Sequence, residues 1–342
     1  MRLLSADEFL KSEESWNAMV ENDPSSTIFS TWEWLSTFWK HFGDESRLAI
    51  FVLEKSNRLI AAAPLCYKTN DSPRQLQFIG TPRVDYADFV TTIGEKGTLK
   101  LLKHIRSQPP WESLQLEQVP QESRTPHLCS ECFQRRFSVR VMDLVVCPYI
   151  TLPREWAEYK KIHRRVARNA RYYERKLRAE YSLDTKLHRK IELNDPLMDC
   201  LIQLHQRRQA ELGHGGVFST HEMQAFHKEL AHLLSNKNRA ILHILYADSV
   251  PISAYYAFIY RRWCGLYIKG INPDFSRFSP GYLHTSLLIK EIIDAKSSEV
   301  LDFTRGDEPY KFYFASERTV NRLITVQNVN ASAQAANSSQ PL

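Results

Sequence analysis

The sequence predicts an α/β (α+β) fold built from two similar domains in tandem, each a mixed twisted sheet flanked by helices. Two observations predict it. First, residues 47–68 (RLAIFVLEKSNRLIAAAPLCYK) align without a gap with residues 239–260 (RAILHILYADSVPISAYYAFIY), at an offset of 192, and both segments have the pattern of a β-hairpin. Second, each hairpin is followed by a strand ending in glycine, a polar loop, an amphipathic helix and another strand. These elements are Leu76–Gly80, Thr98–Ser107 and Ser113–Val119 in the first copy, and Leu266–Gly270, Thr285–Ser297 and Glu299–Thr304 in the second.

The segments around the repeats indicate further elements and a domain boundary. An aromatic-rich amphipathic helix is expected over Trp32–Phe42, with Ser30 and Thr31 as its possible caps. Phe137–Cys147 has the composition of a strand, and two prolines follow it, at positions 148 and 153. We therefore expect one domain at residues 1–149 and a second at 150–328.

Two more helices are expected before the second repeat, at Leu197–Leu212 and Thr220–Ser235. After the second domain, residues 329–342 are rich in Asn, Ser, Ala and Gln. Such a composition buries too little apolar surface to become ordered, so this tail is expected to be disordered.

Composition bounds the class of protein. The 342 residues are 43% hydrophobic, enough for two ordinary cores, and no apolar run approaches the ~20 residues of a membrane span. The N-terminal residues turn polar too early for a signal peptide, so a cytoplasmic location is expected. Motifs of the GxxxxGK[ST], GxGxxG and GxSxG kinds are missing, which argues against a P-loop, a dinucleotide fingerprint and a common serine hydrolase.

The cysteines and histidines do not predict a metal site. Six cysteines are spread through apparent strands and loops, without the density of a disulfide scaffold, and are expected to be reduced thiols. The cluster of His127, Cys129 and Cys132 lacks the second ligand pair that a structural zinc site needs. We therefore expect these to be ordinary loop residues and no bound metal.

Positive charge is concentrated in one predicted helix, within residues 156–180. Between Lys160 and Arg178 there are nine basic residues and one acidic residue, Glu174. Apolar side chains line one face of this helix: Ile162, Val166, Ala170, Tyr173 and Leu177. Another face carries arginines at spacings of four and three: Arg164, Arg168, Arg171, Arg175 and Arg178. This row is either a solvated face that keeps the protein soluble or a binding surface for a polyanion such as phosphates, RNA or an acidic glycan.

In the second repeat, three expected strands, Ala240–Tyr246, Ile252–Tyr260 and Trp263–Gly270, are followed by the loop Ile271–Gly281, a helix and the strand Val300–Thr304. This order of a three-stranded meander, loop, helix and strand resembles the core of the GNAT (acyl-CoA N-acetyltransferase) superfamily. The more specific resemblance is to its CelD-like branch of tandem domains, related to the Fem peptidyltransferases. The matching segments span roughly residues 30 to 315. They are Trp34-Leu35, Ala63-Pro64-Leu65, Asp85-Tyr86-Ala87-Asp88-Phe89, Pro251-Ile252-Ser253-Ala254, Ser279-Pro280-Gly281 and the run from Asp302 to Lys311.

The resemblance implies acetyl-CoA, or another acyl-CoA, as co-substrate, with its pyrophosphate at the start of the helix that follows the meander. The helix N-terminus would supply N–H groups and a positive dipole end. Arg277 could neutralise charge, Ser279 could cap or donate, Gly281 could let the phosphate approach, and Tyr282 lies in the same first turn. The alternative is that Ser-Pro-Gly is only a turn before a helix. At this point the superfamily usually has a glycine-rich phosphate loop, and this sequence has the segment from Arg277 to Gly281 instead.

Acyl transfer to an amine needs a base for the incoming ammonium and an acid for the leaving thiolate. Asp302, Asp307 and Glu308 are candidate bases. By the resemblance, Tyr310 would protonate the thiolate, and Lys311 could hold a substrate phosphate or carboxylate. A salt-bridged turn, with Lys311 covering apolar surface, is the structural alternative.

In the first repeat, Asp85, Tyr86 and Asp88 occupy the equivalent of the cofactor loop, with acidic side chains where phosphate would lie. We expect this domain to have lost cofactor binding and to line the substrate site, with Asp85 and Tyr86 facing the substrate. The expected activity is transfer of an acyl group, acetyl in the first instance, from acyl-CoA to an amine of a sugar, sugar nucleotide or peptide-like acceptor. The alternatives are a Fem-like transferase that uses aminoacyl-tRNA and a non-catalytic binding module.

Overall fold

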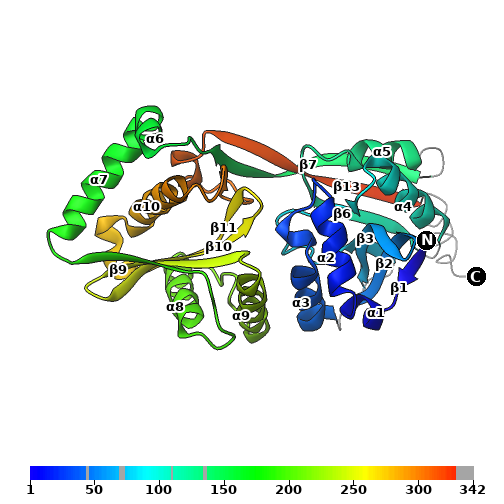
Figure 1. Ribbon diagram of the computed structural model, residues 1–342, viewed down its shortest axis with the longest axis horizontal. Helices are drawn as coiled ribbons and strands as arrows, with labels where there is room; N and C mark the ends of the chain where they lie inside the picture. Colours follow the sequence, from blue (N-terminus) through cyan, green and yellow to red (C-terminus); the bar gives the residue numbers. More distant parts are fainter. Residues whose placement is uncertain (44–45, 69–73, 109–110, 134–136, 329–342) are drawn as a thin grey trace, which may run out of the picture. The chain divides into compact units, whose positions relative to one another are not determined.

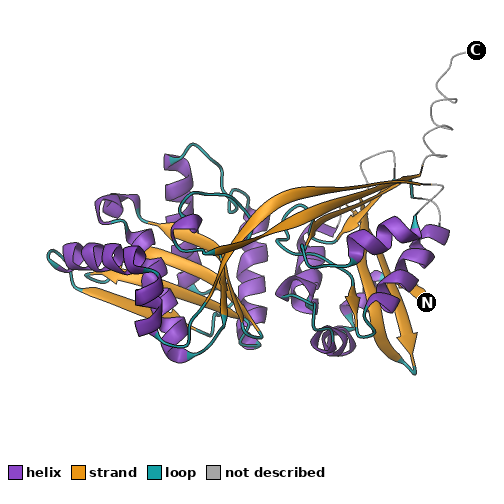
Figure 2. Ribbon diagram, turned by 90° about the horizontal axis from the view of Figure 1, so that it is seen from above, coloured by secondary structure: helices purple, strands orange, loops and turns teal. Residues whose placement is uncertain are grey.

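The computed structural model describes residues 1–43, 46–68, 74–108, 111–133 and 137–328. Its contacts divide the chain into two compact units, each containing helices and strands (Figure 2). The first unit comprises residues 1–145 and 319–328, and the second comprises residues 146–318. The predicted α/β fold with two similar domains is therefore confirmed. The predicted disordered tail, 329–342, lies outside the described residues.

The first unit has a six-stranded path in the order β1-β2-β3-β4-β6-β13, with β5 paired to β3. Only β4 and β6 run parallel to each other; the other neighbours are antiparallel. In chain order its elements are β1 (Arg2–Leu4), α1 (Ala6–Leu10), α2 (Glu13–Asn22), η1 (Ile28–Ser30), α3 (Trp32–Phe42), β2 (Ser46–Lys55), β3 (Arg58–Lys68), β4 (Gln75–Phe78), β5 (Val90–Thr91), α4 (Glu95–Ser107), β6 (Ser113–Val119), α5 (Thr125–Cys132) and the final strand β13 (Glu317–Asn328).

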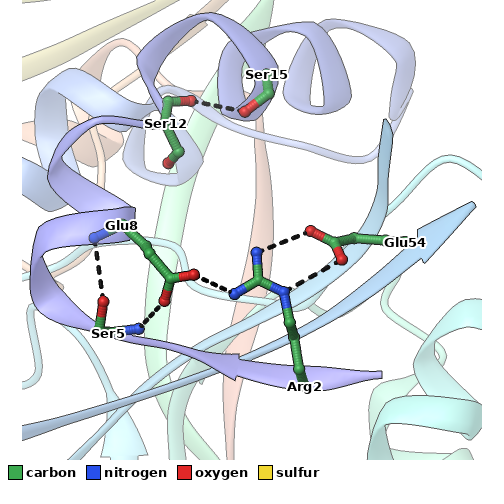
Figure 3. A network of polar contacts seen from close by, with 6 residues as sticks. All are labelled: Arg2, Ser5, Glu8, Ser12, Ser15 and Glu54. Carbon is green, nitrogen blue, oxygen red and sulfur yellow. Dashed lines mark hydrogen bonds and ion pairs between the residues drawn. The ribbon is translucent and has the colours of Figure 1, made fainter. Parts of the chain in front are cut away.

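A network of polar contacts fixes the N-terminus of the first unit (Figure 3). Ser5 and Glu8 form a capping box at α1, in which the Glu8 side chain accepts from the Ser5 N–H at 2.8 Å and Ser5 Oγ accepts from the Glu8 N–H at 3.2 Å. The Arg2 guanidinium contacts Glu8 at 2.5 Å and Glu54 on β2 at 3.1 Å. Together these contacts hold β1 and α1 against the edge of the sheet.

The second unit repeats the same strand pattern in the order β7-β12-β11-β10-β9-β8 (Figure 1). Here too one neighbouring pair is parallel, β11 with β12, and the other four pairs are antiparallel. Its elements are the part of β7 (Phe137–Thr151) from residue 146 on, α6 (Trp156–Ile162), α7 (Arg164–Arg178), β8 (Leu183–His188), α8 (Pro196–Glu211), α9 (His221–Asn236), β9 (Ala240–Ala247), β10 (Val250–Tyr260), β11 (Trp263–Ile271), η3 (Pro273–Phe278), α10 (Pro280–Ala295), β12 (Val300–Asp302) and η4 (Lys311–Tyr313).

The internal repeat predicted from the sequence corresponds to matching elements. The hairpin β2–β3 corresponds to β9–β10, and α4 corresponds to α10. The match extends to backbone detail: Gln118 at the end of β6 and Thr304 just after β12 are both buried and both have positive φ, 61° and 56°. Since non-glycine residues rarely adopt this conformation, its recurrence supports a duplicated unit.

The last strand of each sheet comes from a different part of the chain than the sequence suggests. β7 follows the first unit, yet its residues Tyr149–Thr151 pair with β12 of the second. β13 follows the second unit, yet its residues Arg322–Gln327 pair with β6 of the first. The predicted domain ranges follow chain order, and the boundary near residue 150 remains a prediction. The contacts place residues 319–328 with the first unit because β13 completes that sheet.

The basic segment forms two helices, since the chain breaks at His163 between α6 and α7. Val166, Ala170 and Leu177 form the buried face of α7, as predicted. Ile162, which we predicted on that apolar face, is 62% exposed because it precedes the break. Within the described residues, no helix combines the length and apolar character needed to cross a bilayer.

Helices cover both faces of the second sheet. Figure 1 shows α7 and α10 on one face and α8 and α9 on the other. The packing of α8 on β11 is close at Gly270, where an added Cβ would lie 2.7 Å from Leu204 Cβ, 2.9 Å from the His205 nitrogen and 3.0 Å from the Leu201 carbonyl oxygen. Two of these atoms belong to the helix backbone, so a side chain at position 270 would displace the helix.

We expect Gly270→Ala to lower the free energy of unfolding by about 1–3 kcal/mol, the usual cost of overpacking a close-packed site. Gly215→Ala is the matched control, because its Cβ would meet only Ser219 Cβ, at 3.6 Å, and should change stability by less than about 0.5 kcal/mol. Urea denaturation of the two variants measures the difference. Equal urea midpoints for the two variants would show that α8 can shift to accept the added methyl group without loss of stability.

Candidate functional site

The parallel ladder between β11 and β12 is short. Among the described residues it consists of three pairs, ending at Gly265 opposite Asp302. Beyond this point the chain after β12 bonds to β7, with the Phe303 N–H donating to the Pro148 carbonyl at 2.9 Å and the Gly306 N–H to the Val146 carbonyl at 2.8 Å. A register shift between β10 and β11 near Tyr256 further distorts β11. The second half of β11 therefore has no backbone ladder to β12, and side chains can occupy the space beside it.

Asp302 closes the end of this ladder. It is 6% exposed, and its two carboxylate oxygens accept from Trp263 Nε1 at 2.9 Å and from the Thr304 N–H at 2.7 Å. Thr304 Oγ1 in turn donates to the Leu266 carbonyl at 3.5 Å. Both oxygens thus hold the strand end in place, which is a structural use of a residue that the sequence offers as a base.

The loop after Thr304 folds back on itself around Lys311. The Lys311 side chain is 4% exposed, and its Nζ donates to the Arg305 carbonyl at 2.6 Å and pairs with Glu308 at 2.9 Å. Gly306 makes this possible: at φ +121° its Cβ would lie 2.3 Å from a Glu308 carboxylate oxygen. Asp307 is exposed, and Glu308 is 55% exposed. The ammonium of Lys311 is therefore engaged by its own loop.

Lys269 on β11 contacts Tyr310 of this loop. Its Nζ lies 3.2 Å from the centroid of the Tyr310 ring, and both side chains are half-buried. Burial lowers the pKa of Lys269 to about 7; the nearby Glu308 carboxylate opposes this shift, and the cations of Lys311 and Arg208 add to it. Burial also raises the pKa of Tyr310 well above its usual value. The site therefore holds an amine that is partly neutral at pH 7 beside a phenol that stays protonated.

The sequence analysis missed Lys269. The residue is the single charged position in the strand WCGLYIKGI, and it pairs with Tyr255, a buried position of β10. Since directly paired residues point to the same face of a sheet, a lysine there must enter the covered face. The place of Lys269 in this strand is therefore the sequence feature from which its burial could have been predicted.

The backbone at Lys269 is also fixed. His205 Nδ1 on α8 donates to the Lys269 carbonyl at 2.8 Å, and His205 Nε2 accepts from the Val217 N–H at 3.3 Å. The carbonyl can only accept, so this pair of bonds sets the tautomer of His205.

The start of α10 carries the residues predicted to meet a pyrophosphate. Ser279 has φ +48° and its side chain makes no capping bond. Gly281 is buried, and a Cβ there would lie 2.6 Å from Ile271 Cδ1, so this glycine allows α10 to approach β11. Arg277 is 59% exposed, forms an ion pair with Glu180 and stacks over Phe278 at 4.5 Å. Its charge is therefore shared with a carboxylate.

Tyr282 links three elements of the second unit. Its ring lies 5.7 Å from Tyr173 on α7, 4.7 Å from Phe314 and 6.3 Å from Tyr313 on η4. Burial raises the pKa of Tyr282, and a hydrogen bond with Asn169 opposes the shift. Through this aromatic cluster, α7 lies next to the loop that carries Tyr310.

The predicted arginine row of α7 is exposed in full: Arg164, Arg168, Arg171, Arg175 and Arg178. In the part of the chain that the structure describes, the first four form no ion pair, whereas the fifth, Arg178, pairs with Glu174 at 3.0 Å. Four uncompensated guanidinium groups on one helix give this face a strongly positive local potential.

Asp85 and Tyr86 are in the interior of the first unit. Asp85 is 4% exposed and its carbonyl accepts from Asn321 Nδ2 on β13 at 2.7 Å, while Tyr86 is 8% exposed and packs 6.0 Å from Phe29. Asp88 accepts from Thr125 Oγ1 at 2.6 Å, and burial raises its pKa. These residues thus support the interior of the first unit; the predicted substrate contact of Asp85 and Tyr86 stays a prediction. Among the described residues, no group of three or more His, Cys, Asp or Glu side chains is arranged to hold a metal ion.

Comparisons with known proteins give one domain match and several similar folds. Residues 164–312 match the family model described as an acetyltransferase (GNAT) domain. A comparison with curated proteins gives no match. FemX has a TM-score of 0.65 at 9% identity, covering 98% of this chain and 99% of its own. A conserved protein of unknown function from Bacteroides thetaiotaomicron has a TM-score of 0.61 at 10% identity, and the match covers 93% of this chain and 97% of that protein. At these identities the structural likeness shows a shared fold.

Proposed function

We propose that this protein is an N-acyltransferase, because residues 164–312 match an acetyltransferase (GNAT) domain and the chain shares the fold of FemX. It moves an acyl group, acetyl in the first instance, from acyl-CoA to an amine of a sugar, sugar nucleotide or peptide-like acceptor. The observation that carries the proposal is the contact of Lys269 with Tyr310 beside the end of the β11–β12 ladder. There, an amine and a phenol with opposite pKa shifts lie next to each other.

Lys269 is the base in this scheme. An amine acceptor arrives mostly as an ammonium, and its lone pair is available only after it loses a proton. Neutral Lys269 takes that proton, and the acceptor nitrogen then attacks the thioester carbonyl. The new C–N bond forms as the carbonyl becomes an oxyanion. With a pKa of about 7, Lys269 is neutral in a large share of molecules at physiological pH.

Tyr310 is the acid in this scheme. When the tetrahedral intermediate collapses, the C–S bond breaks and the thiolate leaves with the electron pair. Tyr310 donates its phenolic proton to this sulfur. The resulting phenolate then takes the second proton from the acceptor nitrogen, which leaves a neutral amide and restores the phenol. Its raised pKa makes it a weak acid at rest, but the Lys269 ammonium formed in the first step, with its Nζ 3.2 Å from the centroid of the Tyr310 ring, stabilises the phenolate. The two proton transfers are thereby coupled.

The start of α10 supports donor binding under this proposal. Ser279, Gly281 and Tyr282 would lie along the pyrophosphate, and Arg277 would exchange its contact with Glu180 for a phosphate oxygen. The free thiol state of the six cysteines fits the cytoplasmic location we propose.

The test is release of free thiol from acetyl-CoA in a screen of amine-bearing metabolites and sugar nucleotides, paired with thermal shift by acetyl-CoA and by coenzyme A. A ligand that binds only the folded state raises the melting temperature, by an amount that grows with its concentration over Kd. We expect a shift with both ligands and thiol release with at least one amine. A melting temperature unchanged by either ligand would overturn the acyl-CoA proposal.

One observation favours a second candidate, a Fem-like transferase that uses aminoacyl-tRNA. The exposed arginines of α7 lie on a helix joined to the Tyr310 loop by the Tyr282 cluster, and such a row can bind RNA phosphates. If tRNA alone raises the melting temperature, and the rise disappears in high salt, this candidate replaces the first. Absence of a shift with acetyl-CoA, coenzyme A and tRNA would favour a non-catalytic binding module.

A further inference from the structure

A chain of hydrogen bonds crosses the covered face of the second unit, between α10 and strands β9 and β10. Glu291 contacts His243 Nε2 at 2.8 Å, His243 Nδ1 lies 2.6 Å from His284 Nε2, and His284 Nδ1 lies 2.8 Å from Ser253 Oγ. His243, His284 and Ser253 have no exposed surface, whereas the Glu291 side chain is 39% exposed. The chain therefore joins the protein surface to a buried hydroxyl.

The chemistry of the groups gives this chain a direction. The hydrogen bond from His243 is the largest influence lowering the pKa of Glu291, so this carboxylate is ionised at neutral pH and can only accept. His243 must then carry its proton on Nε2 and present a bare Nδ1. His284 donates to that nitrogen from Nε2, and its own bare Nδ1 accepts from the Ser253 hydroxyl. With the protons placed in this way, each of the four side chains has a hydrogen-bond partner in the chain.

One added proton reverses the chain without breaking it. If His284 passes its Nε2 proton to His243 and binds one proton from solvent on Nδ1, the Ser253 hydroxyl keeps its own proton and turns from donor to acceptor. The result is an imidazolium at His243 beside the Glu291 carboxylate, and a His284 that is still neutral but now protonated on Nδ1. Burial, His243 and Lys269 all lower the pKa of His284, whereas His243 Nε2 lies 2.8 Å from the Glu291 carboxylate, so this arrangement places the positive charge beside that carboxylate.

The chain lies next to the candidate catalytic pair. The ring of His284 is 4.9 Å from that of Tyr255, and Tyr255 pairs with Lys269 on β11. Tyr255 also shares a hydrogen bond of 2.5 Å with Thr285 on α10. A positive charge on His284 would act directly on Lys269, whereas one on His243 is neutralised by Glu291.

We propose that Glu291, His243, His284 and Ser253 form a proton relay that keeps His284 neutral beside Lys269 and stores an excess proton at His243. In this role the four are positioning residues, and their link to catalysis rests on the proposed acyl transfer. The other charged groups that face the relay are His188 on β8, which is close to His243, and Arg189, which is close to Glu291.

The relay is tested on the full chain by NMR of protein labelled with ¹⁵N in its histidines, over a pH titration. Above neutral pH we expect both histidines to carry hydrogen on Nε2. On acidification, we expect His243 to become doubly protonated while His284 changes to the Nδ1 form without gaining charge. An imidazolium at His284, or two histidines that titrate independently, would overturn the relay.

Kinetics test the link to acyl transfer. We expect Glu291→Gln and Ser253→Ala each to lower kcat by about three- to tenfold with KM unchanged, and the double variant to lose no more than either single variant, because members of one chain are not additive. Asp294→Asn is the control: it removes a charge from the same helix, at a residue paired with Lys290. Additive losses, or an equal loss in the control, would overturn the positioning role. The NMR result does not depend on activity, so an inactive protein with the expected tautomers refutes the proposed function and not the relay.

Discussion

Replacing Lys269 by methionine is expected to lower kcat/KM for the amine acceptor by about 10²- to 10⁴-fold, the range for loss of a general base. Methionine retains most of the length and apolar contact of the lysine stem but cannot accept a proton. Because burial disfavours the lysine ammonium, the fold should tolerate this change, and the melting temperature should not fall. Steady-state kinetics with acetyl-CoA and an identified acceptor provide the measurement.

The assignment of Lys269 as the base also predicts the direction in which activity changes with pH. A base works only when neutral, so kcat/KM should rise with pH and level off above a pKa near 7, the value to which burial lowers that of Lys269. Replacing either of two charged neighbours should shift the pH at which kcat/KM rises, and the two shifts should have opposite directions. The Glu308 carboxylate raises the pKa of Lys269 and the Arg208 cation lowers it, so Glu308→Gln should shift the rise to lower pH and Arg208→Gln to higher pH.

Tyr310→Phe is the matched variant for the acid. It retains the ring over which Lys269 lies but removes the phenolic proton. Turnover should therefore fall, while the pKa above which kcat/KM levels off should stay near 7. A Lys269→Met enzyme with unchanged kcat/KM, or shifts of the same sign in the Glu308 and Arg208 variants, would remove Lys269 from the mechanism.

The fold could be predicted from the sequence where local patterns dominate. The helix Trp32–Phe42 has the predicted bounds, since its capping threonine and its apolar spacing agree. The paired hairpins follow from the alternation of apolar residues and from the repeat. The origin of β13 was not predictable in this way, because a strand's pattern records which face is buried and not which neighbour it pairs with.

The site was predicted only in part, for a related reason. The run from Asp302 to Lys311 is one loop, and the sequence identifies it. Lys269 joins it through a contact between residues 41 positions apart, which depends on where the β11–β12 ladder ends. The end of a ladder cannot be read from local composition, and the position of Lys269 in an otherwise uncharged strand indicates that its side chain enters the covered face but not what it contacts there. The engagement of Lys311 by the Arg305 carbonyl and Glu308 is likewise a property of the folded loop.

Asp302→Ala is expected to lower the free energy of unfolding by roughly 2–6 kcal/mol, because it leaves two donors without the acceptor they have in the native protein, at about 1–3 kcal/mol each. These donors are Trp263 Nε1 and the Thr304 N–H. Asp302→Asn retains one acceptor oxygen and should fall between the wild type and the alanine variant. Urea denaturation followed by tryptophan fluorescence gives the values.

The same pair of variants separates a structural Asp302 from a catalytic one. If Asp302 holds the strand end, stability and activity fall together, and low temperature or bound acetyl-CoA restores part of the activity of the asparagine variant. If Asp302 is instead the base, the asparagine variant keeps its unfolding free energy and loses turnover by a factor comparable to that of Lys269→Met. Because both oxygens of Asp302 already accept hydrogen bonds from its own strand end, we expect the first outcome.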